Sequence, residues 1–530
     1  MTRWWGRWSR SMIVTLSGIV AASGLLFVFL GDFWTDENWY YAGSWLVAHG
    51  SLPYLDFFTH HNPLVFYLYG LVQKAAGPSL LVGRVESWTF WTAAVLLLVR
   101  LAWKLGGRGA AVLFLLLVLT NPFATRFFTT FSWRPLEALL MAGALTVTCH
   151  QPWGGWRYPV LAVFLALVVV LRFPVDLGTI ILGLALLYVT VRWRKKKWIV
   201  AASYGAVTLV LGVVLLPPLL YAPAQYVFDV IRYPLSLASY EKSVGLLGHL
   251  DTPVSQLFSA VRLFGEELRF FLASILLFLL TVAYGVADSR ARGGGWFAWC
   301  RRREDWWWLI MAYAVIGEVL MVASQQAEPV TRIVPFVLVS LMVSVECVRL
   351  GERVLAPDAG RFLWTTVGLT LFLAPWLQDV GHAGLRGRWS SSDLFRIRRA
   401  AAAVRASTAA NREILTFLPA VVTEADRPIA LGMIMEAWSI FPTFDTPTSM
   451  KYRVVNVQML LRAISDPQSG AIVLSRPGRL EDDAGVGVLL RPYRDQIGAS
   501  IEHGYRRVAA VPGPRQGRTE PVSIEIYLPK

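Results

Sequence analysis

The chain has 530 residues, of which 55% are hydrophobic and only 16% are charged, and its mean hydropathy is +0.50. This composition excludes an ordinary soluble globular protein. The net charge of +15 suggests nucleic-acid binding, but the basic residues occur mostly in short clusters between apolar stretches. That distribution is typical of membrane topology and not of a nucleic-acid-binding stripe. We therefore expect an integral membrane protein.

The first apolar stretch, Met12–Leu30, follows three arginines, and the small residues Ala22-Ser23-Gly24 lie inside it. No small-residue cleavage site comes after it, so we predict a retained anchor and not a signal peptide. Eleven stretches approach the roughly 20 apolar residues that cross a bilayer. They lie near residues 12–30, 80–101, 109–121, 134–149, 158–172, 177–191, 198–220, 269–287, 306–324, 330–347 and 362–378.

The positions of the basic clusters set the orientation of these spans. With the N-terminus in the cytoplasm, nearly every short cluster falls on the cytoplasmic side, including the run Arg194-Lys195-Lys196-Lys197. This holds only if the apolar stretch Pro63–Val72, about ten residues long, does not span the membrane. We predict that it is an interfacial helix within a long external loop, residues 31–79.

After the last span the composition becomes polar and mixed. Residues 379–530 contain two helix-like segments, Ser391–Phe417 and Val454–Ile464, and four β-type runs: Pro428–Ile434, Ala471–Leu474, Arg507–Val511 and Val522–Leu528. This alternation predicts a small extracytoplasmic α/β domain after a membrane domain of residues 1–378. Cys149, Cys300 and Cys347 all fall in or next to cytoplasmic segments, so we expect no disulfide framework.

The first external loop carries an unusual group of residues. It reads Thr35-Asp36-Glu37-Asn38-Trp39-Tyr40-Tyr41, then Pro53-Tyr54-Leu55-Asp56, then His60-His61-Asn62-Pro63-Leu64. Carboxylates at a membrane rim are costly unless they have partners or a chemical task. The order of these residues resembles the first external loop of the GT-C membrane glycosyltransferases, in particular the protein O-mannosyltransferase and aminoarabinose transferase groups. The resemblance extends through Gly77-Pro78-Ser79-Leu80 to Arg84 and loosely to Arg134-Pro135-Leu136-Glu137.

The resemblance implies an inverting transferase that moves a sugar from a polyprenyl-phosphate carrier to a hydroxyl acceptor at the outer leaflet. Asp36 would then be the catalytic base, with Glu37 beside it, and Tyr40 would donate to a phosphate oxygen. Asp56 and Tyr54 would bind the acceptor or support the site. The alternatives from spacing alone are a solvated or helix-capping acidic pair, an interfacial tyrosine and a turn residue after Pro53.

His60 and His61 stand where aminoarabinose transferases have a Glu-Lys pair, so the chain departs from that pattern. We interpret them as donors to the carrier phosphate. The alternative is a divalent cation held by Asp36, Glu37 and His60, since imidazole and carboxylates form an adequate ligand set. The spacing does not decide between these, and we name no other cofactor.

Four arginines, Arg84, Arg134, Arg172 and Arg332, fall at the outer ends of predicted spans, against the positive-inside trend. Guanidinium groups match a phosphate bidentately, so Arg84 and Arg134 are candidates for donor binding, and Arg172 and Arg332 for supporting positions. The alternative is structural pairing, such as Arg134 with Glu137 or Arg172 with Asp176. Glu318, inside a predicted span, has no assigned role.

These observations predict an all-α polytopic GT-C-like membrane domain with a small C-terminal α/β domain, acting as a cell-membrane glycosyltransferase without nucleic-acid partners. Two other functions remain open: a non-catalytic transporter or envelope-assembly scaffold, and an oligosaccharide ligase with a polyprenyl-diphosphate donor. The absence of a convincing internal repeat weakens the transporter interpretation.

Overall fold

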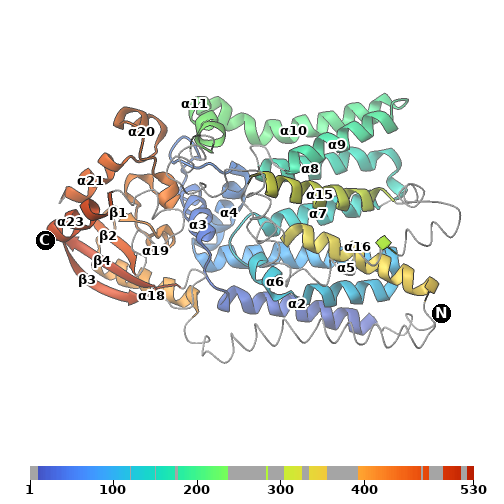
Figure 1. Cartoon of the computed structure of the whole chain (residues 1–530), viewed down its shortest axis with the longest axis horizontal. Coiled ribbons are helices and arrows are strands. Elements are labelled where there is room, and N and C mark those ends of the chain that lie inside the picture. The colour runs from blue at the N-terminus through green and yellow to red at the C-terminus, as the bar shows by residue number, and fades with distance from the viewer. Residues whose placement is uncertain are drawn as a thin grey trace.

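The computed structural model describes residues 10–119, 121–149, 151–172, 177–234, 236, 282–283, 304–324, 333–354, 392–466, 470–476, 493–514 and 522–530. Within these residues the chain is mostly helical. A bundle of long helices makes up one part, and a small sheet with short helices lies at one end of it (Figure 1). A helical membrane protein with a small sheet, as the sequence predicted, is confirmed at this level.

The long helices follow the apolar stretches closely. They are α2 (Arg10–Leu30), α5 (Leu80–Leu119), α7 (Arg134–Thr148), α8 (Arg157–Arg172), α9 (Leu177–Arg192), α10 (Lys197–Tyr221), α15 (Asp305–Ser324) and α16 (Ile333–Val354). Shorter helical segments join or extend them: α6 (Pro122–Phe128), η1 (Gln151–Trp156), α11 (Pro223–Val227) and η2 (Phe228–Arg232).

Helix α5 contains the two stretches predicted near 80–101 and 109–121. The backbone leaves helical geometry at Gly106 and Gly107, and Gly107 has a φ of 72°. A residue without a Cβ adopts this left-handed conformation readily. The glycine pair therefore separates α5 into two helical arms at the position where the sequence places a turn between spans.

Four described helices are long and apolar enough to cross a membrane: α2, α5, a stretch at Gly154–Leu171 and α10. On α10, Leu209 and Val213 are each 67% exposed and Leu220 is 72% exposed. Apolar side chains this exposed suit contact with lipid, because the cost of facing water disappears there. The chain is thus a multi-pass membrane protein. The total of eleven spans stays a prediction, since the stretch near 362–378 and all but residues 282 and 283 of the stretch near 269–287 lie outside the described residues.

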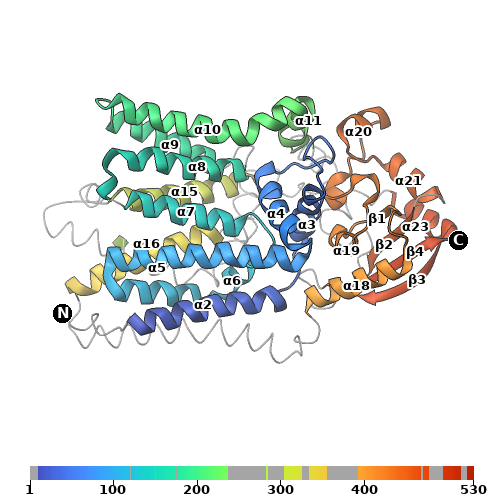
Figure 2. The ribbon, with the colours of Figure 1, turned by 180° about the vertical axis from the view of Figure 1, so that it is seen from behind.

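Two helices occupy residues 31–79, the loop that the sequence predicts to be external and that is called the first external loop below. Helix α3 (Thr35–Ala48) begins with Asp36 and Glu37 in its first turn, where carboxylates interact favourably with the helix dipole. Helix α4 (Pro63–Ala76) starts on Pro63, whose fixed φ suits the first helical position. Both helices lie at the end of the bundle that faces the α/β part (Figure 2).

The C-terminal part is a four-stranded sheet with the strand order β1-β2-β4-β3. Its strands are β1 (Ile414–Thr416), β2 (Ala471–Arg476), β3 (Tyr505–Pro512) and β4 (Ser523–Pro529). β1 pairs with β2 in parallel, and the other pairs are antiparallel, with Val473 opposite Ile526. The helical segments are α18 (Asp393–Ser407), α19 (Pro419–Glu424), η5 (Ala430–Gly432), η6 (Glu436–Ser439), α20 (Thr446–Tyr452), α21 (Val457–Ser465) and α23 (Arg494–Gly504).

Two local predictions for this part were wrong. The helix expected over Ser391–Phe417 ends at Ser407, and its last residues form β1, because Ile414, Leu415 and Thr416 are buried against β2. The strand expected over Pro428–Ile434 is a 3-10 turn, in which Leu431 and Gly432 have φ values of 55° and 64°. Left-handed residues cannot continue an extended strand.

The α/β part and the first external loop lie at the same end of the helical bundle. Figures 1 and 2 show α19 next to α3 and α18 near the end of α2, while the turn between α9 and α10, which carries Arg194 to Lys197, lies at the opposite end. The side chain of Asn38 on α3 accepts a hydrogen bond from Ala420 N at the start of α19, at 3.1 Å. Helix α3, which carries Asp36 and Glu37 in its first turn, therefore lies between the bundle and the sheet.

Candidate active site

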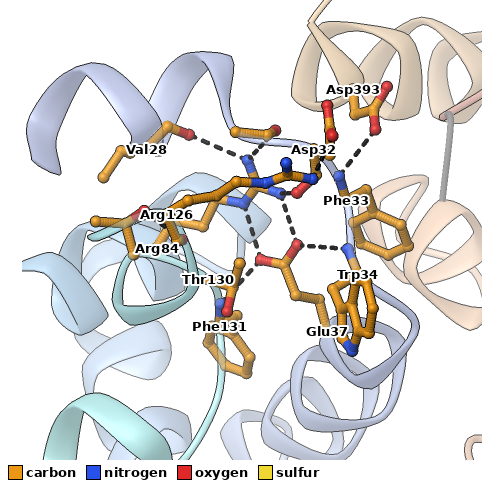
Figure 3. A network of polar contacts seen from close by, with 12 residues as sticks. Val28, Asp32, Phe33, Trp34, Glu37, Arg84, Arg126, Thr130, Phe131 and Asp393 are labelled. Atoms are coloured by element: carbon orange, nitrogen blue, oxygen red, sulfur yellow. Dashed lines mark hydrogen bonds and ion pairs between the residues drawn. The ribbon is translucent and has the colours of Figure 1, made fainter. Parts of the chain in front are cut away.

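Glu37 is the centre of a buried polar network, which Figure 3 shows. Arg84 on α5 donates from Nε to Glu37 Oε1 at 2.8 Å and from Nη2 to Oε2 at 2.6 Å. Phe131 N donates to Oε1 at 2.8 Å, and Trp34 N donates to Oε2 at 3.2 Å. Glu37 and Arg84 are 0% and 1% exposed. Glu37 is therefore a buried carboxylate whose two oxygens are fully engaged.

The remaining N–H groups of Arg84 bind backbone carbonyls at the end of α2. Nη1 donates to Val28 O and Gly31 O, and Nη2 also donates to Asp32 O, each at 3.2 Å. A guanidinium has five N–H groups, and all five are used in these contacts. This differs from the expectation that Arg84 binds a carrier phosphate, because such binding would require breaking a buried bond.

The network continues outward to the α/β part. Asp32 forms an ion pair with Arg126 on α6, and Phe33 N donates to Asp393 Oδ2 on α18 at 2.8 Å. Figure 3 shows these groups around the Arg84 guanidinium. The chain between α2 and α3 is thus held by charged groups from three separate regions.

Asp36, the neighbour of Glu37, has a different environment. Its Oδ2 accepts from Arg134 Nη1 at 3.1 Å, and the two side chains are 18% and 5% exposed. The Arg134 guanidinium lies over the Trp133 ring, with 5.1 Å to the ring centroid. Arg134 thus faces Asp36, while Glu137, its alternative partner from the sequence, accepts a hydrogen bond from Tyr313 on α15. Asp36 retains solvent access beside a nearly buried cation.

His60 and His61 lie next to this pair. Their ring centroids are 4.2 Å apart, and the His61 ring is 5.1 Å from that of the buried Tyr40. Burial lowers the pKa of His61 to about 3, with a further contribution from Arg134. Burial and His61 lower the pKa of His60, and Asp36 opposes this. The structure therefore brings Asp36, Arg134, Tyr40 and two neutral imidazoles together.

The other predicted residues have different positions. Asp56 is exposed and accepts from Leu52 N at 2.7 Å, which closes a local turn. Tyr54 is buried, has a φ of 67° and donates from its hydroxyl to His61 O at 2.7 Å, so it holds the histidine loop. Arg332 and the side chains of Arg172 and Glu318 lie outside what the structure describes.

Several residues that hold the site together could not be predicted from the sequence, because their partners lie far away along the chain. Glu424 Oε2 accepts from the Tyr41 hydroxyl at 2.7 Å and from Leu80 N, at the start of α5, at 2.9 Å. Asp229, which is fully buried in η2, accepts from Gln225 Nε2 at 2.6 Å and from Thr59 N at 3.4 Å. No local pattern marks such contacts, although an acid shortly after a predicted span, as at Asp229, is a usable signal.

The proposed metal ligands do not form a fitting set. Glu37 is fully engaged by Arg84 and backbone donors, which leaves only Asp36 and His60 of the three. In the part of the chain that the structure describes, no group of three or more His, Cys, Asp or Glu side chains is arranged to hold a metal ion. We therefore derive no catalytic step through a cation.

Comparison with solved structures gives the fold. The chain aligns with ArnT from Cupriavidus metallidurans over 97% of its own length and 98% of that chain, with a TM-score of 0.59 and 12% identity. The chain has a GT-C fold. ArnT bound to undecaprenyl phosphate aligns with a TM-score of 0.58 and 13% identity over 97% of each chain.

A second GT-C protein is also similar. The Archaeoglobus fulgidus oligosaccharyltransferase, in a complex with Zn and sulfate, aligns over 93% of this chain and 71% of that chain, with a TM-score of 0.51 and 13% identity. No family model matches the sequence, and no curated protein matches it. At these identities the likeness to the solved structures establishes the fold.

Proposed function

We propose that the protein is a membrane glycosyltransferase that takes a sugar from a polyprenyl-phosphate carrier and transfers it to a hydroxyl acceptor outside the cytoplasm. The observation that carries this proposal is Asp36, a partly exposed carboxylate paired with one arginine on a GT-C fold. ArnT, with the same fold, has been solved bound to undecaprenyl phosphate. That ligand is the carrier that such a reaction would release.

In this proposal Asp36 removes the proton from the acceptor hydroxyl as its oxygen attacks the anomeric carbon of the sugar. The bond between that carbon and the phosphate oxygen breaks, and the electron pair leaves with the polyprenyl phosphate. Attack opposite the leaving group inverts the anomeric carbon. Arg134 lies against Asp36, where its guanidinium can receive the developing phosphate charge.

Glu37 and Arg84 take a supporting role in this scheme. Their buried pair joins the first turn of α3 to α5 and to Phe131 N. This fixes the helix that carries Asp36 without using either group in the reaction, which changes the roles expected from the sequence. We propose the same for Tyr54, which holds the His60–His61 loop through His61 O.

We also propose the predicted orientation: an N-terminus in the cytoplasm, residues 379–530 outside and eleven spans. The α/β part packs on the first external loop, and the basic turn between α9 and α10 lies at the other end of the bundle. This arrangement agrees with the positive-inside rule.

The test is release of free carrier by the full-length protein in liposomes. Undecaprenyl phosphate linked to mannose, glucose or arabinose is supplied with a mixture of lipid and glycan acceptors, and free undecaprenyl phosphate is quantified by mass spectrometry. We expect protein-dependent release from one donor, with inversion at the anomeric carbon. No release and no binding of any linked carrier would overturn the proposal.

A further inference from the structure

Four residues next to Asp36 form a cluster with an unusual property. Trp39, His60, His61 and Asn62, here called the Trp–His–Asn cluster, come from α3 and from the loop that leads into α4. The Trp39 ring stacks on that of His61, with centroids 5.7 Å apart, and meets His60 edge-on at 6.0 Å. The cluster is continuous with the candidate site.

Among the described residues, the cluster contains five buried polar atoms without a hydrogen-bond partner: Trp39 Nε1, His60 Nδ1, His61 Nε2, and Nδ2 and Oδ1 of Asn62. Asn62 precedes α4 but does not cap it through its side chain, and it is only 1% exposed. Buried polar groups in proteins nearly always have partners, so five neighbouring exceptions require an explanation. A polar ligand would provide one.

The chemistry of the cluster limits the kind of ligand. Trp39 Nε1 donates only, a neutral imidazole offers one donor and one acceptor, and an amide offers both. Burial lowers the pKa of both histidines, so the cluster carries no charge at neutral pH. Such a set suits hydroxyl groups, which donate and accept, and it adds no positive charge for a phosphate.

Aromatic rings surround these polar atoms. The Tyr233 ring stacks on His60, with a centroid distance of 6.0 Å and an interplanar angle of 15°. Trp438, from the α/β part, meets Trp39 edge-on at 6.3 Å, and the Tyr233 hydroxyl donates to Trp438 O. Apolar walls with a few convergent polar groups are typical of small-molecule sites. The rings would cover the C–H faces of a sugar while the polar atoms bind its hydroxyls.

We propose that the Trp–His–Asn cluster binds the neutral, hydroxylated ring of a sugar, next to the phosphate position at Arg134. This inference rests on the proposed function for the source of the sugar, which is either the donor or a glycan acceptor. It gives the two histidines a role different from phosphate binding. It also gives the α/β part, through Trp438, a share in sugar selection.

The experiment compares three probes on full-length protein in nanodiscs: undecaprenyl phosphate, the same carrier linked to mannose, glucose or arabinose, and the corresponding methyl glycosides. Trp39→Phe and Asn62→Leu remove three of the five atoms while they keep apolar bulk. Each lost hydrogen bond is expected to weaken sugar binding by about 10-fold, from about 1.4 kcal/mol. Binding of bare undecaprenyl phosphate should change by less than about twofold, because no charged contact is lost.

Helix α3 offers a matched control. Trp45 and His49 also form a ring pair, with centroids 4.1 Å apart, but His49 Nδ1 already contacts Trp45 O at 2.8 Å. Trp45→Phe and His49→Phe should leave binding of all three probes unchanged. Thermal unfolding of every variant shows whether it is folded. Trp39→Phe and Asn62→Leu are made separately, so the test still stands if one of them does not fold.

Each outcome decides the proposal. Selective loss for the linked carrier supports a donor-sugar site, and selective loss for the glycosides supports an acceptor-sugar site. Equal loss for linked and bare carriers overturns the proposal in favour of phosphate binding. No loss for any probe also overturns it, because the cluster then binds none of these ligands. If the wild type binds neither carrier, the proposed function fails, and glycoside binding by the wild type and Trp39→Phe still tests the cluster.

Discussion

Asp36 and Glu37 are neighbours in one turn of α3, yet their surroundings differ sharply. Glu37 is 0% exposed and accepts four hydrogen bonds, while Asp36 is 18% exposed and faces a single arginine at 3.1 Å. Arg84 uses all its N–H groups in its contacts, and Arg134 has a buried Nε that lacks a partner among the described residues. We call Glu37–Arg84 the saturated pair, because all its hydrogen-bonding groups are used, and this suits a role in anchoring α3. We call Asp36–Arg134 the unsaturated pair, because it has groups left to bind a substrate, and this suits a role in the reaction.

The largest expected effect comes from breaking the saturated pair. Glu37→Gln leaves the Arg84 charge buried without its counterion, and such a loss typically costs about 3–5 kcal/mol. We expect much lower thermal stability and poor yield of folded protein in detergent, measured by fluorescence-detected gel filtration. Asp32→Asn, in the more exposed pair with Arg126, is the control and should cost less. Equal stability of both variants would contradict the anchoring role.

Changing the unsaturated pair should instead affect the reaction. Asp36→Asn keeps the size of the side chain and removes the base, so sugar transfer should fall by about 100-fold or more. The free energy of unfolding should fall less than in Glu37→Gln, because Asp36 is 18% exposed and the asparagine oxygen can still accept from Arg134 Nη1. Transfer in liposomes and thermal unfolding are measured on the same preparation. Near-normal turnover would remove Asp36 from the mechanism.

Arg134→Lys tests the other half of the unsaturated pair. Lysine keeps the charge but loses the planar fork that matches a phosphate, so donor binding should weaken by about 10- to 100-fold, from about 1.5–3 kcal/mol. Arg126→Lys is the matched control, since Arg126 pairs with Asp32 in the neighbouring network. Titration with undecaprenyl phosphate measures both. Similar losses in the two variants would assign Arg134 to structure.

The smallest effect concerns His61 and pH. Its folded-state pKa of about 3 lies below the usual value near 6.5, so the unfolded chain binds the extra proton as the pH falls. This group therefore lowers stability progressively below about pH 6.5. The wild type should lose more thermal stability than His61→Gln between about pH 6.5 and 5, with His49→Gln as the control. Identical pH profiles for the wild type and His61→Gln would show that folding does not lower the pKa of His61.

The sequence predicted the helices of the membrane part well because apolar stretches are local signals. It predicted the start of α4 at Pro63, and Gly106-Gly107 falls between two expected spans. It also grouped Asp36, Arg134 and the histidines as candidates for one site. It did not predict which carboxylate pairs with which arginine, because Asp36–Arg134 and Glu37–Arg84 depend on helix packing over 98 and 47 residues.

Predictions in the α/β part were weaker for a related reason. The short strand β1 is defined by pairing with β2, more than 50 residues later, and nothing in Ile414–Thr416 alone distinguishes it from the end of a helix. Leu431 is left-handed although leucine rarely adopts that conformation, so an apolar run looked like a strand. The contacts of Asp229 and Glu424 likewise depend on distant partners.

The contact between α3 and the α/β part sets an order of events during synthesis. Tyr41 and Glu424 are 383 residues apart in the chain, and Phe33 and Asp393 are 360 apart. At about 5–20 residues per second, tens of seconds separate the two halves of each contact. Throughout that interval α3 and the residues just before it lack their contacts with Glu424 and Asp393 of the α/β part. The surroundings of Asp36 and Glu37 are therefore completed only as the last part of the chain emerges, so α3 gains its final contacts after almost the whole chain has been made.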